Sequence, residues 1–97
     1  MPVTSKRGNE VLLNLKNHGP LSTPILHQMM FPKMWRNNIK KSLDVLRKQG
    51  LIRRWYVLGG KYGLAFYEIA QSPEAREAVA KRIDCHPDEL IKPFYRR

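Results

Sequence analysis

Glycine and proline divide this chain into short intervals, and the positions of these breaks constrain its fold more than any other feature. The breaks fall at Gly19-Pro20, Phe31-Pro32, Gly50, the Gly59–Gly63 stretch and Ser72-Pro73. Proline cannot continue a helical hydrogen-bond ladder, and glycine suits the left-handed position that closes a helix. Each interval is therefore expected to form its own short element. A chain of 97 residues built in this way should fold as a single small domain.

The intervals in the first third of the chain predict two helices. Apolar residues at helical spacing predict the first over residues 9–17. Residues 21–22 would then form a short extended piece. Thr23 followed by Pro24 is typical of a helix start, and this second helix should run to about Met30.

The intervals after Gly50 predict a hairpin and a further helix. Residues 51–58 and 64–70 are rich in β-branched and aromatic side chains, and a glycine-containing loop joins them. Two such runs around a glycine loop are typical of a β-hairpin. Ser72 is expected to cap a helix that ends near Ile83, and residues 86–89 have the pattern of another helix start.

A longer helix, predicted over residues 33–49, has two chemically different faces. The apolar stripe that should face the core contains Trp35, Ile39, Leu43 and Leu46. The opposite arc is basic and carries Lys33, Asn37, Lys40, Lys41, Asp44 and Lys48, with Arg36 and Arg47 at its border. Because Trp35 falls on the apolar arc, we expect it to pack in the core rather than serve as a stacking platform for single strands.

The positive charge of the chain is concentrated in its first two thirds. The formal net charge is +10. Lys and Arg outnumber the acids only within residues 1–67, whereas the two signs balance over residues 68–97. Such a concentration attracts polyanions, and a small domain with a pI above ~9 has the charge signature of nucleic-acid binders. The other interpretation is a solvated basic surface that only aids solubility.

Several classes of protein are excluded by what the sequence lacks. No stretch approaches the ~18 apolar residues of a membrane span, and no apolar run of a signal peptide begins the chain. Cys85 is the only cysteine, and the histidines have no metal-ligand spacing. No catalytic motif is recognisable. We therefore expect a cytoplasmic protein that is not an enzyme and that needs no metal, cofactor or small-molecule ligand.

The order of predicted elements and three stretches of sequence resemble the winged helix-turn-helix family of DNA-binding domains. The stretches are LLNLKNHGPLSTPILHQMMFP, WRNNIKKSLDVLRKQGLIRRWYV and GGKYGLAFYEIA, which together span about residues 11–70. Within the family the chain is most similar to small winged domains of plasmids and phages, including replication-relaxation proteins. That narrower likeness rests on the Leu26-His27…Phe31-Pro32 segment and on the Leu43-x-x-Leu46…Gly50-Leu51-Ile52-Arg53-Arg54 segment.

The resemblance implies a fold and a domain organisation. The fold would be α+β and mostly helical, with three helices, a two-stranded β-hairpin wing and one or two C-terminal helices. Residues 1–70 would be the DNA-binding domain, and residues 71–97 a helical extension of the same compact domain. The implied partner is double-stranded DNA, and the implied role is regulation of transcription or replication, with the protein associated with the nucleoid when bound.

The basic arc of the longer helix supplies the candidate DNA contacts. Asn pairs well with adenine and Arg with guanine, so Asn37 is the first candidate for reading a base and Arg36 the second. Point charges hold phosphates without reading sequence, so phosphate contacts are expected from Lys40, Lys41 and Lys48, and Lys33 is a further candidate DNA contact on the same arc. In the hairpin the candidate DNA contacts are Arg53 and Arg54 at the base of the first strand and Lys61 at the tip, where a phosphate contact is expected. The alternative interpretation is an ordinary solvated helix face with a plain turn.

Apolar residues on unexpected faces favour a homodimer. The first predicted strand is apolar on both faces, and Leu13 lies opposite the core face of its helix. The last long helix carries a narrow stripe that could cover the sheet of its own chain or meet a second copy, and the resemblance to winged-helix proteins implies the second. The predicted dimer contacts are Leu13, Trp55, Val79, Ile83, Phe94 and Tyr95.

Two other functions compete with DNA binding. A winged helix can serve as an assembly module that binds RNA or a protein through its basic face. RNA stems hide their base edges in a narrow groove, so an RNA binder would not need Asn37 on the helix. A decoy that blocks a nucleic-acid enzyme is disfavoured, because such decoys are usually acidic.

Overall fold

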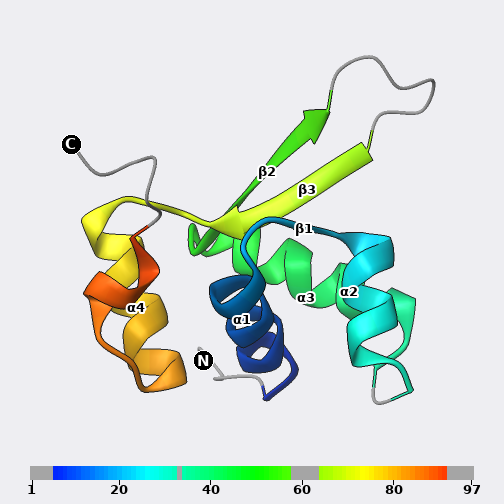
Figure 1. The fold of residues 1–97 in the computed structure, drawn as a ribbon, viewed down its shortest axis with the longest axis horizontal. Helices are drawn as coiled ribbons and strands as arrows, with labels where there is room; N and C mark the ends of the chain where they lie inside the picture. Colours follow the sequence, from blue (N-terminus) through cyan, green and yellow to red (C-terminus); the bar gives the residue numbers. More distant parts are fainter. Residues whose placement is uncertain (1–5, 33, 58–63, 92–97) are drawn as a thin grey trace.

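The computed structural model describes residues 6–32, 34–57 and 64–91. The helices lie below and beside a small antiparallel sheet in an α+β arrangement (Figure 1). The elements in chain order are α1 (Lys6–His18), β1 (Leu21–Ser22), α2 (Thr23–Met30), α3 (Arg36–Lys48), β2 (Ile52–Val57), β3 (Leu64–Ile69), α4 (Pro73–Ile83) and the 3-10 helix η1 (Pro87–Leu90).

The helices begin and end close to the glycine and proline breaks of the sequence. Gly19 and Gly50 have φ angles of 79° and 77°, the left-handed conformation that closes α1 and α3. The Ser72 hydroxyl accepts a hydrogen bond of 3.2 Å from the Ala75 amide and caps α4. At η1 the side chain of His86 accepts from the backbone, and Glu89 accepts in return from the His86 amide. These boundaries confirm the predicted starts of the two C-terminal helices.

The sheet has three strands, where a two-stranded hairpin was predicted. The hairpin itself is confirmed, because β2 pairs with β3 from Ile52 opposite Ile69 to Val57 opposite Leu64. The third strand is β1, which pairs with the other edge of β3 and gives the order β1-β3-β2. Its two residues were expected to be extended, but a two-residue segment contains no pattern that reveals its pairing partner.

The core lies between α1, α3 and the sheet. The apolar stripe of α3 is confirmed at Ile39, Leu43 and Leu46, each at most 1% exposed. Leu12 and Leu15 of α1 pack in the same buried cluster. Since α3 buries this stripe, its opposite arc is left facing outwards.

Trp35 does not belong to that stripe, contrary to the prediction. The helix begins at Arg36, and Trp35 is its N-cap, with an extended backbone at φ −77° and ψ 154°. A helical wheel does not apply to a residue outside the helix, and the Trp35 side chain is 65% exposed. Met34, which is 2% exposed, occupies the core beside it.

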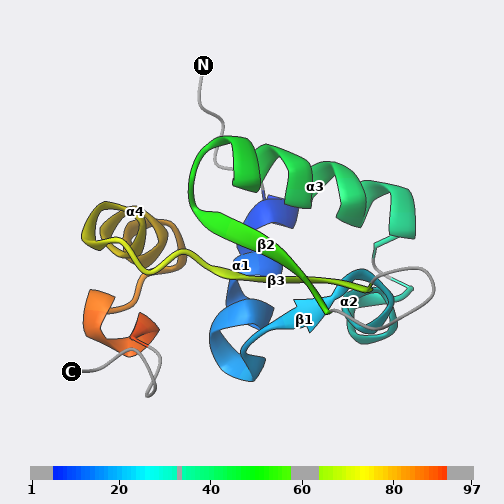
Figure 2. The ribbon, with the colours of Figure 1, turned by 90° about the horizontal axis from the view of Figure 1, so that it is seen from above.

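The α4 helix packs against its own chain. It contacts α1, β3 and η1 (Figures 1 and 2). Val79 is fully buried there, and Ala75 is 5% exposed. The small-residue stripe therefore completes the core of one chain, which corrects the expectation that Val79 meets a second copy.

None of the helices in the described residues has both the length and the apolar character of a membrane span.

Candidate nucleic-acid interface

The outward arc of α3 forms an exposed basic ridge at its N-terminal end. Arg36, Asn37, Lys40 and Lys41 are all exposed, as their positions on the predicted wheel require. None of the three cations forms an ion pair with a described residue. These charges are therefore available to an external anion, and we call this set of four residues the α3 ridge.

The C-terminal half of α3 is different, because an acid partly neutralises it. Asp44 lies 3.3 Å from the Arg47 guanidinium and 3.3 Å from the Lys48 ammonium. The hydrogen bond from Lys48 and its charge lower the pKa of Asp44, with a smaller contribution from Arg47. The predicted phosphate contact Lys48 thus remains exposed but shares its charge with Asp44.

A groove runs along one side of the α3 ridge, between α3 and the sheet. Its volume is about 420 Å³, and it is lined by Thr23, Lys40, Lys41, Asp44, Arg47, Arg54 and Tyr67. Arg54 lies directly across the hairpin from Tyr67, and a hydrogen bond with Tyr67 raises its pKa. The Arg54 guanidinium also lies 5.4 Å from the centre of the Tyr56 ring. The structure thus places the predicted contact Arg54 in the same groove as Lys40 and Lys41.

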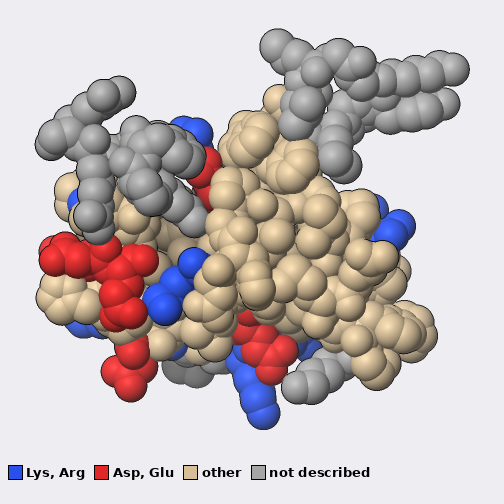
Figure 3. All heavy atoms as spheres, viewed as in Figure 1, with Lys and Arg blue, Asp and Glu red and all other residues tan. Residues whose placement is uncertain are grey.

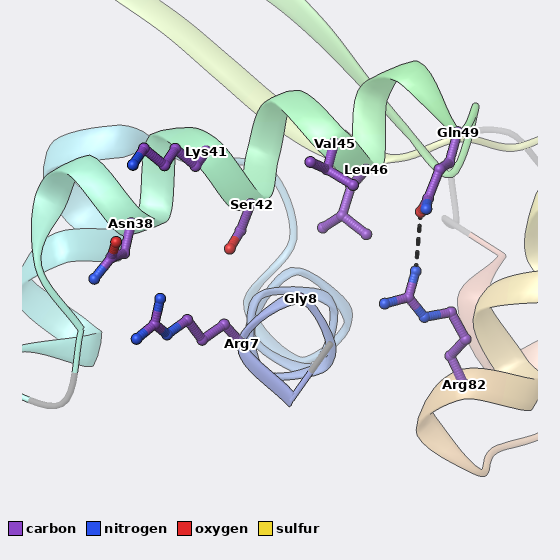
Figure 4. Close-up of a pocket in the computed structure, with 9 residues that line it drawn as sticks. All are labelled: Arg7, Gly8, Asn38, Lys41, Ser42, Val45, Leu46, Gln49 and Arg82. Atoms are coloured by element: carbon purple, nitrogen blue, oxygen red, sulfur yellow. Dashed lines mark hydrogen bonds between the residues drawn. The ribbon is translucent and has the colours of Figure 1, made fainter. Parts of the chain in front are cut away.

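A second pocket, of about 170 Å³, lies on the other side of α3, between α3, α1 and α4 (Figure 4). It is lined by Arg7, Gly8, Asn38, Lys41, Ser42, Val45, Leu46, Gln49 and Arg82. Below α3 in this view, Arg7 extends from α1 toward the Asn38 end of the pocket, and Arg82 reaches from α4 toward Gln49. No Asp or Glu is among its described lining residues. Lys41 lines both cavities, so α3 stands between two cation-lined hollows.

Two amide oxygens hold Arg82 in this pocket. Its Nε donates to Asn9 Oδ1 and its Nη1 to Gln49 Oε1, both at 3.1 Å. Burial lowers the pKa of Arg82. Neutral acceptors leave the positive charge uncancelled, so this guanidinium favours an incoming anion. Arg7 and Arg82 were absent from the predicted site because no short-range pattern links α1 and α4 to the face of α3.

Arg53 forms an ion pair within the chain that the sequence did not predict. Its Nε donates to Glu68 Oε1 at 3.2 Å, across the hairpin, and the Glu68 side chain is only 2% exposed. The Arg53 guanidinium therefore compensates a buried carboxylate of its own chain. The Arg53 side chain is 55% exposed, so the predicted DNA contact at this residue stays a prediction beside its ion pair, and neighbouring Arg54 lines the groove.

Apart from Asp44, the acidic residues lie outside α3. Figure 3 views the molecule with α3 at the back, and the Asp and Glu side chains on the visible face gather mainly over α4 and η1. Most of the remaining visible surface is neither acidic nor basic. The C-terminal third is therefore a poor surface for phosphate, in agreement with its balanced charge in the sequence.

Some of the remaining predicted site residues lie outside the residues that the structure describes. Lys33 and Lys61 of the DNA-binding set, and Phe94 and Tyr95 of the dimer set, lie outside the described residues. Leu13 is 40% exposed on α1. The other two described dimer residues have partners in their own chain: the Trp55 ring stacks on Phe66, and Ile83 packs against the core.

Comparisons of the chain with protein-family models, with curated proteins and with solved structures found no match.

Proposed function

We propose that this chain is a sequence-specific double-stranded DNA-binding protein of the winged helix-turn-helix type, which regulates transcription or replication. The observation that carries the proposal is the α3 ridge, an exposed basic helix face between two cation-lined hollows. A role as a plain solvated surface would not require cations from α1, α4 and the sheet to converge on the two sides of one helix.

The arrangement suits the dimensions of B-DNA. A major groove is ~12 Å wide and admits one α-helix, and a phosphate backbone runs along each side of it. With α3 in the groove, Arg54 and Lys40 would face one backbone, and Arg7 and Arg82 the other. Arg36 and Asn37 in the first turn of α3 would face the base edges, because winged domains present the N-terminal part of this helix.

The test separates phosphate contacts from base contacts. Bound sites are first selected from a random duplex pool at ~150 mM salt, near physiological ionic strength. Lys41→Ala should weaken binding to the selected site and to random duplex alike, and should reduce the salt slope by about one. Asn37→Ala should cost about 1–3 kcal/mol on the selected site while leaving random duplex unchanged. Lys81→Ala, which removes an exposed charge on α4, is the matched control and should change neither.

Two results would contradict the proposal. If the pool yields no enriched sequence, the protein does not read DNA bases. If Lys81→Ala weakens binding as much as Lys41→Ala, only net charge matters, and α3 has no special role.

A further inference from the structure

Three aromatic rings lie in a row where α2 leads into α3, and none of them contributes to the interface described above. His27 and Phe31 meet edge to face at 5.4 Å between ring centres, and Phe31 and Trp35 meet in the same way at 5.7 Å. Phe31 is 50% exposed and Trp35 is 65% exposed. We call these three residues the aromatic row. Such large apolar side chains are usually buried, so their exposure next to a binding surface indicates contact with a partner.

The aromatic row is held in place by the backbone beneath it. The Phe31 amide donates to the His27 carbonyl at 2.8 Å, and the Trp35 carbonyl accepts from the Ile39 amide at 3.0 Å. Met30 and Met34, on the chain beside these rings, are 4% and 2% exposed and anchor the turn in the core. These contacts fix the backbone positions from which the rings project, which lowers the entropic cost of stacking on them.

The charge around the aromatic row favours a nucleic acid over a second copy of the chain. Arg36 directly follows Trp35, and Lys40 lies one turn further along α3. The sequence contains no Asp or Glu between Glu10 and Asp44. A second copy docked on the rings would bring like charges together, whereas a nucleic acid offers flat bases to the rings and phosphates to the cations.

We propose that the aromatic row stacks on unpaired bases, so that the protein binds most tightly where a single-stranded segment adjoins duplex DNA. This inference rests on the proposed function, since the α3 ridge would hold the duplex while Phe31 and Trp35 receive the bases that leave it. Aromatic side chains stack on any base, so this contact adds affinity for a DNA structure and not for a sequence.

The experiment compares three DNA probes of equal phosphate number: a fully paired duplex, a shorter duplex with an overhang of unpaired thymidines, and a single strand. Affinities are measured by anisotropy of the labelled probes with the full chain. The wild type should prefer the overhang probe over the paired duplex by about tenfold, as expected for one or two stacked bases. Trp35→Ala should abolish this preference and change paired-duplex binding less than twofold. Trp35→Phe should retain most of the preference.

Two further variants keep the result interpretable. Leu13→Ala removes an exposed apolar side chain from α1 and should leave the preference intact. In the Trp55→Phe background Trp35 is the one remaining tryptophan, and its fluorescence, excited at a wavelength that tyrosine does not absorb, should be quenched by the overhang probe more than by the paired duplex. Circular dichroism melting checks that each variant is folded. The Trp35 variants are expected to fold, because this side chain is largely exposed and contributes little to the core.

The outcomes separate this inference from the proposed function. Equal loss on paired and overhang probes with Trp35→Ala, or no loss at all, overturns the stacking role and leaves duplex binding standing. A Trp35→Ala change that lowers the sedimentation coefficient instead assigns the row to self-association and also overturns it. If the paired duplex does not bind but the single strand does, in a Trp35-dependent way, the duplex proposal fails and the aromatic row is supported.

Discussion

Replacing Arg53 with methionine tests whether this residue serves the fold or the DNA. The change keeps the apolar part of the side chain and removes the guanidinium that lies 3.2 Å from the Glu68 carboxylate. At that distance two unit charges attract by about 5 kcal/mol at an effective dielectric constant of ~20. Water screens part of this attraction, because the Arg53 side chain is 55% exposed. Glu68, at 2% exposure, cannot regain its full hydration when the partner is removed.

We therefore expect Arg53→Met to lower the free energy of unfolding by about 1–3 kcal/mol, between the values typical of exposed and of buried pairs. In a thermal melt this corresponds to about 4–8 °C for each kcal/mol. Urea unfolding followed by circular dichroism measures the loss. The cost of Arg53→Met should shrink in a Glu68→Gln background, which gives a double-mutant cycle for the pair.

The reasoning is refuted if Arg53→Met changes stability by less than about 0.5 kcal/mol, the range of ordinary surface substitutions. It is also refuted if the variant keeps its stability but loses as much duplex affinity as Lys41→Ala, because Arg53 would then be a DNA contact after all.

Four further predictions follow from other parts of the structure. Leu43→Ala opens a cavity at a residue only 1% exposed and should lower the free energy of unfolding by about 2–5 kcal/mol in a urea titration. Gly50→Ala should cost about 1–2 kcal/mol in the same assay, from backbone strain alone, since an added Cβ at φ +77° would meet nothing within 4 Å. Asp44→Asn should tighten duplex binding and steepen its salt dependence in an anisotropy titration, because it removes the acid that pairs with Arg47 and Lys48. The pKa of Glu89 is lowered, mainly by the hydrogen bond from the His86 amide. The stability that Glu89 contributes is therefore complete above the pKa of the unfolded chain and is lost as the pH falls through the lower pKa of the folded chain. Glu89→Gln should flatten this part of the stability profile in melts recorded over a series of pH values.

The helices and the hairpin were predictable because local chemistry decides them. Ser72 before Pro73 and the glycines at positions 19 and 50 act within one turn of the chain, so the sequence alone locates those ends. The exposed basic arc of α3 was predictable for the same reason, since Ile39 and Leu43 fix which side of the helix faces the core.

The parts that could not be predicted depend on distant residues or on a boundary shift. Moving the start of α3 from position 33 to Arg36 takes Trp35 off the wheel and out of the core. The pairing of Arg53 with Glu68 depends on the register of the hairpin, which the composition of the strands does not fix. Arg82 reaches the face of α3 only because α4 folds back along α1, a packing choice with no sequence signal of its own.

The position of β2 in the sheet has a consequence for how copies of the chain can associate. Among the described strands β2 pairs only with β3 and so lies at an edge of the sheet, and such an edge can template the addition of a strand from another molecule. Arg53 and Arg54 are consecutive on β2, so their side chains leave opposite faces of the strand: Arg53 pairs with Glu68 on one face, and Arg54 places positive charge on the other. A matching edge from a second copy would carry the same charges. Repulsion between these charges therefore opposes the joining of two chains into one continuous sheet, and it protects the β2 edge from aggregation.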